Sequence, residues 1–210
     1  MTLLCTGYEP FGEHNANPSA QVARELDGET VAGHEIVGEV LPVEFDRVDD
    51  ELAGLVAEHD PAAVVATGLA AGRTTVSVER VGVNLNDAVT VPDNVDASPH
   101  ATAITADGAD AHFATVPVVE AVEAMLDAGV PARVSNSAGT HCCNHALYSL
   151  LDQFERSGRD TPAGFVHLPL TPEQAIDEAE APERGGGVTA SLPLSLQIDG
   201  VRTVFETTVE

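Results

Sequence analysis

The alternation of helix-patterned and strand-patterned segments is the feature that most restricts how this chain can fold. Residues 44–59 place a set of apolar side chains on one face of a helix: Phe45, Val48, Leu52, Leu55 and Val56. The next segment, Ala62–Thr67, reads AAVVAT, which is typical of a strand buried on both faces. Because this alternation recurs along the chain, it predicts the α/β class. We expect residues 1–210 to form a single three-layer α/β/α domain around a largely parallel, mixed and twisted sheet.

Other segments fit the same scheme. We expect strands at 2–6, 34–43, 74–85, 132–136 and 164–168, and helices at 19–26, 116–128, 144–155 and 194–208. Ser19 is the expected cap of the first helix, and Thr171 with Gln174 predicts a capping box at another helix start. Residues 86–115 carry no clear pattern and predict an irregular cover segment. Residues 181–191 are rich in glycine and predict a linker before the C-terminal helix.

The chain is strongly acidic. It holds 34 Asp and Glu against nine basic residues, all of them Arg, for a net charge of −25. The acidic residues are spread along the chain, so they predict a solvated acidic surface rather than an acidic tail. Such a surface repels nucleic acids and anionic membranes, so neither is an expected partner. Adaptation to molar salt is the favoured interpretation, because salt screens this self-repulsion; an acidic mesophilic protein is the alternative.

The expected localisation is cytoplasmic. Cys5, Cys142 and Cys143 do not form the even, spaced set of a disulfide framework. The N-terminus lacks a basic segment followed by a long apolar stretch, and no window approaches 18 uninterrupted apolar residues. The sequence therefore predicts a soluble protein in a reducing compartment.

Two adjacent cysteines are the first candidates for chemistry. The stretch GTHCCNHALYSLL, residues 139–151, leads from a turn of small residues into a helix. Cys143 is expected in the first helical turn, where unpaired N–H groups and the positive end of the helix dipole favour a thiolate. The same N–H groups can form an oxyanion hole. The alternative is a buried pair of inert thiols.

A cysteine nucleophile needs a base and a third group that orients the base. His167 lies in the apolar stretch GFVHLPL and is the candidate base, because it would emerge at the carboxyl end of a strand. Glu79 lies inside the strand-like stretch TVSVERVGVN and is the candidate orienting acid. The alternatives are a hydrogen-bonded core histidine at position 167, and a carboxylate at position 79 that pairs only with Arg73 or Arg80.

Five stretches, in order, resemble the pyroglutamyl peptidase type I family, also called pyrrolidone carboxyl peptidases. They are TGYEPFGEHNANPS, GLAAGRTTVSVERVGVN, DGADAHFATVPV, VSNSAGTHCCNH and AGFVHLPLTPEQ, and the resemblance spans residues 3–174. It implies a cysteine exopeptidase that hydrolyses the amide bond after an N-terminal pyroglutamyl residue, with no cofactor and no metal. It also implies that the partners are peptides with N-terminal pyroglutamate and that the protein assembles as a homotetramer.

The same resemblance assigns catalytic residues. It implies that Cys143 is the nucleophile, His167 the base and Glu79 the third member of the set, while Cys142 matches a position that is usually apolar. Cys143 would attack the acyl carbon to form a thioester, His167 would protonate the leaving amine, and water would then release 5-oxoproline.

The resemblance also points to substrate-binding residues and to two departures from the family pattern. Tyr8 and Phe11 match aromatic positions of the family's substrate loop, which implies that they sandwich the pyroglutamyl ring, and Asn17 is expected to organise that loop. Val89 stands where the family commonly has Arg, and Leu69 stands where some members have Gln.

Two other functions compete with a peptidase. One is a metal-binding module that uses Cys142, Cys143 and either His141 or His145, although adjacent residues rarely point at one metal ion. The other is a weakly active or inactive homologue that acts as a binding protein, which the Val89 departure suggests.

Overall fold

A computed structural model describes residues 1–180 and 189–209 of the protein, so residues 181–188 of the expected linker lie outside the described residues. The strands are β1 Thr2–Tyr8, β2 Thr30–Val31, β3 His34–Leu41, β4 Ala63–Leu69, β5 Val76–Glu79, β6 Val81–Val83, β7 Ala111–Phe113, β8 Ala132–Ser135 and β9 Ala163–Leu168. The helices are α1 Pro18–Leu26, α2 Phe45–His59, α3 Val118–Asp127, α4 Cys142–Ser157, α5 Pro172–Glu180 and α6 Leu194–Val209.

A mixed sheet forms the centre of the molecule. Among the described residues it has seven strands in the order β2-β3-β1-β4-β9-β5-β8. Strands β3, β1, β4 and β9 run parallel to one another. Strand β5 runs antiparallel to β9, and β8 runs parallel to β5. At the other edge β2 runs antiparallel to β3. The expected α/β class with a mostly parallel, mixed sheet is therefore confirmed, with reversed strands at both edges.

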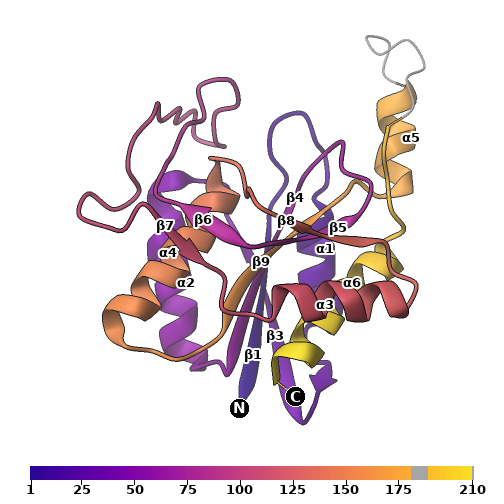
Figure 1. Ribbon diagram of the computed structural model, residues 1–210. Coiled ribbons are helices and arrows are strands. Elements are labelled where there is room, and N and C mark those ends of the chain that lie inside the picture. Colours follow the sequence, from indigo (N-terminus) through magenta and orange to yellow (C-terminus); the bar gives the residue numbers. More distant parts are fainter. Residues whose placement is uncertain (181–188, 210) are drawn as a thin grey trace.

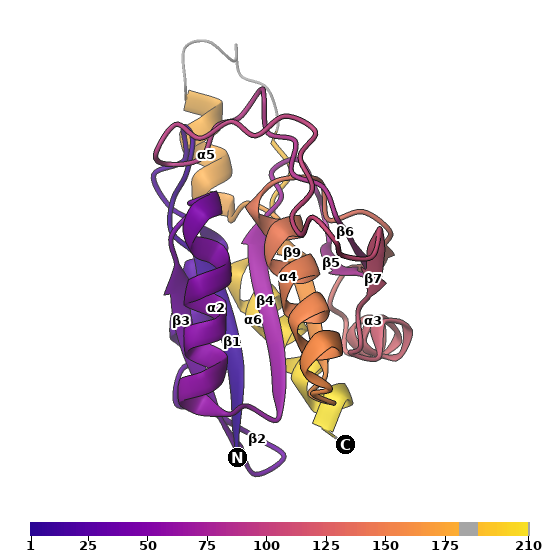
Figure 2. The ribbon, with the colours of Figure 1, turned by 90° about the vertical axis from the view of Figure 1, so that its left-hand side faces the viewer.

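Helices cover both faces of this sheet. Figure 1 shows α2 and α4 on one side and α1, α3 and α6 on the other, while α5 projects beyond the strand ends. Figure 2 shows α2 and α4 lying next to each other in front of the sheet. Along β1, Leu3 packs under α1 and α6, and the next residue, Leu4, packs under α2 and α4. Burial on both faces explains why these strands read as continuous apolar runs.

The segment expected as one strand at 74–85 is two strands in two sheets. After β5, the Arg80 N–H donates to Ser135 O at 2.8 Å, and the Arg80 carbonyl accepts from Ala114 N at 2.9 Å. The chain then pairs Val81 with Phe113 in a small antiparallel sheet of β6 and β7. The prediction of one strand was wrong because alternation shows only that a segment is extended, not which partner each part finds.

Candidate active site

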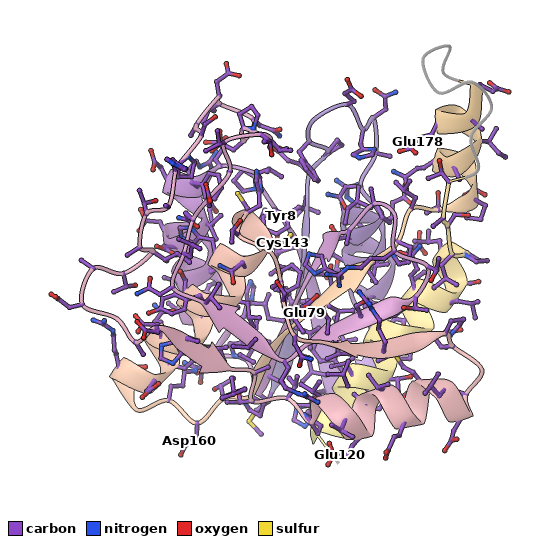
Figure 3. All side chains as sticks on the ribbon, turned by 45° about the horizontal axis from the view of Figure 1, so that its top comes forward. Tyr8, Glu79, Glu120, Cys143, Asp160 and Glu178 are labelled. Atoms are coloured by element: carbon purple, nitrogen blue, oxygen red, sulfur yellow. The ribbon has the colours of Figure 1, made fainter. Side chains whose placement is uncertain are left out.

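The two adjacent cysteines point in different directions at the start of α4. Residues next to each other on a helix are rotated by about 100°, so both cannot face the same neighbour. Cys142 is 1% exposed and packs in the apolar cluster under α2 and α4, whereas Cys143 is half-buried. Figure 3 shows Tyr8, Cys143 and Glu79 near one another in the middle of the molecule, with Glu178 apart from them on α5. Cys143 is thus the cysteine that faces the candidate site.

A glycine on β4 makes room for the Cys143 thiol. A Cβ added at Gly68 would lie 2.7 Å from Cys143 Sγ and 2.9 Å from Phe165 Cζ, both closer than side chains approach each other. The Cys143 sulfur therefore packs directly against the backbone of Gly68. In the register of β4 and β9, Gly68 pairs with His167. The start of α4 thus lies over the strand pair that carries the candidate base.

The candidate base and acid form a buried hydrogen bond. His167 Nδ1 lies 2.7 Å from Glu79 Oε1, and the two residues are 4% and 0% exposed. Ser77 of β5 is opposite His167, so Glu79 is two residues further along the same face. Because an ionised carboxylate only accepts hydrogen bonds, Nδ1 carries the proton and its N–H donates the hydrogen bond to Glu79. The second ring nitrogen, Nε2, is then free to accept a proton.

Arg73 binds the same carboxylate oxygen. Its Nη1 lies 2.6 Å from Glu79 Oε1, and its Nη2 donates to the carbonyl of Ser137 at 3.3 Å. The sequence offered two partners for Glu79, a histidine or an arginine, as alternatives. In the structure both His167 and Arg73 are present at Oε1, and Arg80 instead binds Asn136 Oδ1 at 3.0 Å.

These contacts set the charges of the base and the acid. Burial alone would raise the pKa of Glu79, but the hydrogen bond and charge of His167, with help from Ser135 and Arg73, outweigh burial and lower that pKa. Burial lowers the pKa of His167, Glu79 opposes this shift, and the charges of Arg73 and Arg133 add to it. At neutral pH the pair is therefore a carboxylate and a neutral imidazole.

The Cys143 thiol is held protonated by its surroundings. Burial, followed by the nearby charge of Glu79, raises its pKa to about 12, and Arg73 opposes this rise. The helix-start position predicted a thiolate, but the effect of burial is larger. The resting site therefore combines a neutral thiol with a neutral histidine, and the thiol needs a base to become a nucleophile.

Tyr8 is at the end of β1 and is only 2% exposed. Its hydroxyl donates to the carbonyl of Cys142 at 2.9 Å, and its backbone N–H donates to Ser19 Oγ at 2.9 Å. These contacts tie the N-terminal loop to the start of α4. Tyr8 therefore holds the backbone next to Cys143, and the structure gives its ring little exposed surface.

Phe11 and Asn17 lie in the loop that follows β1. Phe11 stacks on His141 with ring centroids 5.9 Å apart. Asn17 caps α1 through a bond from Ser19 N to its Oδ1 at 3.1 Å, and its Nδ2 donates to the carbonyl of Glu9 at 3.0 Å. The expectation that Ser19 caps this helix was wrong, because α1 begins at Pro18, a common residue at the first helical position, so its cap lies two residues before Ser19.

A cavity of about 900 Å³ opens beside this loop. Its lining comes from residues 11–16, residues 90–94, Asp96, Ala71 and the side of α5 that includes Gln174. The thiol of Cys143 does not line it, so the cavity lies next to the candidate site rather than in it. Gln174 holds the loop in place, because its Nε2 donates to Ala16 O at 2.9 Å.

The two residues after Cys143 are positioning residues that the sequence alone did not identify. Asn144 accepts a hydrogen bond from Val83 N at 2.9 Å and donates to Val83 O at 2.9 Å and Leu85 O at 3.0 Å. His145 lies 2.9 Å from Asn86 through Nδ1 and 2.9 Å from Asp49 through Nε2. Together they fix the first turn of α4 to β6, to the cover segment and to α2. The stretch CCNH contained both residues, but nothing in it indicated these partners.

The described part of the chain holds no helix long and apolar enough to cross a bilayer. It also holds no group of three or more His, Cys, Asp or Glu side chains placed to bind a metal ion.

Fold and site together define a class: an α/β protein with the chemical groups of a cysteine peptidase, namely a thiol at a helix start and a buried histidine–carboxylate pair. A model of the family described as pyroglutamyl peptidase matches residues 1–210. The chain belongs to the pyroglutamyl peptidase family, and the expected enzyme class is confirmed.

Individual relatives agree with this assignment. The pyrrolidone-carboxylate peptidase of Cupriavidus taiwanensis is 43% identical over 207 residues, which cover 98% of this chain and 92% of that protein. The pyrrolidone-carboxylate peptidase of Thermococcus onnurineus is 43% identical over 178 residues, covering 85% of this chain and 88% of that protein. A structure of pyrrolidone carboxyl peptidase from Pyrococcus furiosus superposes with a TM-score of 0.94 at 33% identity, covering 100% of this chain and 98% of that chain.

Proposed function

We propose that this enzyme hydrolyses the amide bond that follows an N-terminal pyroglutamyl residue, with Cys143 as nucleophile, His167 as base and Glu79 as the group that orients the base. The observation that carries the proposal is the buried 2.7 Å hydrogen bond between His167 and Glu79, on a strand register that places His167 beside the Gly68 backbone under Cys143. The three groups come from β9, β5 and α4, so the fold, and not local sequence, assembles them.

Acylation starts from the neutral pair. As Cys143 Sγ attacks the acyl carbon, its proton moves to Nε2 of His167, the new C–S bond forms, and the carbonyl electrons move to oxygen. Glu79 stabilises the imidazolium that results. Collapse of the tetrahedral intermediate breaks the C–N bond, and His167 gives its proton to the leaving amine. The product of this half-reaction is a pyroglutamyl thioester on Cys143.

Deacylation uses the same groups in the same order. A water molecule attacks the thioester carbon while His167 accepts one of its protons. The C–S bond then breaks, the sulfur recovers that proton, and 5-oxoproline leaves. The N–H groups of the first turn of α4 are the proposed oxyanion donors, because the side chain of the capping residue His141 makes no bond to them.

The pyroglutamyl ring is small, flat and uncharged, so it needs apolar walls rather than a cationic partner. We assign one wall to Phe11, whose ring stacks on His141 beside the helix start. Tyr8 contributes by holding the Cys142 carbonyl, and Asn17 by holding the loop that carries Phe11. A homologue that binds such peptides without turnover is the second candidate; its support is Val89, which stands where the family commonly has Arg and is 56% exposed.

The proposed setting is the cytoplasm of a cell with concentrated internal salt, with the enzyme as a homotetramer. A net charge of −25 supports the salt requirement, because assembly brings several acidic surfaces together.

The test is hydrolysis of a fluorogenic pyroglutamyl amide in molar KCl, compared with the matching prolyl and glutamyl amides. Only the pyroglutamyl amide should be cleaved. Cys143→Ala should abolish turnover, while Cys142→Ala, the matched control one residue away, should keep most of it. Equal cleavage of the prolyl amide, or loss of activity only in Cys142→Ala, would overturn the proposal.

A further inference from the structure

Arg73 contacts both the buried acid of the site and the loop leading to the nucleophile. Its Nη1 binds Glu79 Oε1 at 2.6 Å and its Nη2 binds the Ser137 carbonyl at 3.3 Å. The loop that contains Ser137 connects β8 to α4 and ends at the helix start that carries Cys143. The Arg73 guanidinium therefore links the Glu79 carboxylate to the loop that leads to Cys143.

The local chain geometry holds Arg73 in this position. After β4 the chain makes a tight turn in which Arg73 N donates to Ala70 O at 3.2 Å, and Gly72 within it has φ +86°, a conformation that favours glycine. Arg73 is about one-fifth exposed while Glu79 is fully buried. Removing one partner of a shielded ion pair is costly, because the buried charge that remains loses a compensating group.

From these contacts we infer that Arg73 is a positioning residue: it fixes the Glu79 carboxylate and the 136–141 loop in one arrangement, and it limits the negative charge that His167 and Cys143 experience. This inference depends on the proposed function. Two donors, His167 Nδ1 and Arg73 Nη1, converge on Oε1, so the carboxylate cannot rotate without breaking both bonds.

The Arg73 cation disfavours protonation of His167 and favours the thiolate of Cys143, so it lowers the pKa of both groups. Arg133, which binds Ser77 Oγ at 3.1 Å, acts on His167 in the same direction but does not contact Glu79. Removing Arg73 should raise the pKa of His167. The pH profile of kcat/KM reports the pKa values of groups in the free enzyme, so its acid limb should then move to higher pH.

The experiment compares Arg73→Met, Arg73→Lys and Arg80→Met. Arg80 is a matched control, because it also holds the 136–141 loop, through Asn136, but does not contact Glu79. We expect Arg73→Met to lower kcat by about a hundredfold with little change in KM, since a displacement of about 1 Å costs on that order. Its acid limb should move up in pH. Arg73→Lys keeps the charge but only one contact, so it should lose about tenfold in kcat and keep the acid limb in place.

A second readout separates this inference from the proposed function. The rate of iodoacetamide labelling at Cys143, located by peptide mapping at one fixed, mildly alkaline pH, should be lower in Arg73→Met than in the wild type, because loss of the cation reduces the thiolate fraction. If the wild type does not cleave the pyroglutamyl amide, the proposed function fails, and labelling still tests Arg73. If the wild type is active but Arg73→Met matches it in kcat, in the pH profile of kcat/KM and in the labelling rate of Cys143, the inference about Arg73 is wrong. Equal losses in Arg80→Met and Arg73→Met would also contradict it. Should Arg73→Met not fold, wild-type kcat in Arg73→Lys would be sufficient to reject the inference.

Discussion

Gly68→Ala tests the contact between the nucleophile and the sheet. The new Cβ would lie 2.7 Å from Cys143 Sγ, whereas ordinary contact begins at 3.4 Å. The sulfur must therefore move by at least about 0.7 Å, or the α4 start must shift by a similar amount. Because the thiol ends a short side chain, rotation about its Cα–Cβ bond can relieve the clash, and we expect a stability cost of about 1–3 kcal/mol.

Gly68→Ala should lower kcat by more than its effect on the free energy of unfolding would suggest. A displacement of about 1 Å at a reacting atom is worth on the order of a hundredfold, so we expect kcat to fall between about tenfold and a hundredfold. KM should change little, since Phe11 and its loop are not touched. Gly200→Ala is the control: its Cβ would lie 3.2 Å from Val76 Cγ2 and 3.3 Å from Met125 Sδ, a tight fit in the core on the other side of the sheet.

The assay measures kcat and KM for a pyroglutamyl amide together with the thermal unfolding midpoint of each variant. Gly200→Ala should keep wild-type kcat whatever its stability. A folded Gly68→Ala enzyme with wild-type kcat would refute the placement of the sulfur on the β4 backbone. An equal fall of kcat in both variants would show that packing strain anywhere in the molecule, rather than displacement of the sulfur, lowers the rate.

Two further predictions concern charge. Glu79→Gln removes the hydrogen-bonded carboxylate that raises the pKa of His167, so the acid limb of the pH profile of kcat/KM should move to lower pH. The value of kcat should fall by at least about a hundredfold, because the imidazolium loses its negatively charged partner. An acid limb that moves to higher pH would contradict the assignment. Dialysis from molar KCl into about 0.01 M salt lengthens the Debye screening length from roughly 3 Å to roughly 30 Å. We therefore expect loss of folded structure by circular dichroism, of assembly by sizing and of activity, all restored by salt, and a fully active, assembled enzyme in dilute buffer would reject adaptation to salt.

Much of the fold could be predicted because the local patterns agree with the tertiary structure. The amphipathic segment at 44–59 becomes α2 from residue 45 onward, and all but the first residue of the run AAVVAT lies in β4. The capping box of Thr171 and Gln174 forms with bonds of 3.0 and 3.4 Å. Each of these signals depends on residues that are close together in the sequence, so it can be recognised without knowing the tertiary structure. The cap of α1 was readable in the same way, since Asn17 followed by Pro18 is a stronger start signal than Ser19.

The charge state of the nucleophile could not be predicted from the same local signals. A helix start lowers the pKa of a thiol through its unpaired N–H groups, and the position of the helix start can be predicted from the sequence. Burial raises it through atoms from distant parts of the chain, and these include the Gly68 backbone and the Phe165 ring. Since the tertiary effect is the larger one, the site needs His167 as a true base, and this gives the orienting contacts of Glu79 and Arg73 their importance.

The direction of β5 explains why the site forms at this place in the sheet. The sequence suggested that His167 and the turn before Cys143 meet at a shared carboxyl edge of parallel strands. Strands β5 and β8 instead run opposite to β9, so β8 ends beside Glu79, with Ser135 as its register partner, and not beside the end of β9. The 136–141 loop then brings α4 back over β4 and β9, which puts Cys143 above Gly68. Had β5 run parallel to β9, Glu79 and the end of β8 would lie at the same edge as the end of β9. Because β5 is antiparallel to β9, the loop has to return across the sheet, and on this path the Ser137 carbonyl meets Nη2 of Arg73 while Nη1 of the same side chain binds Glu79.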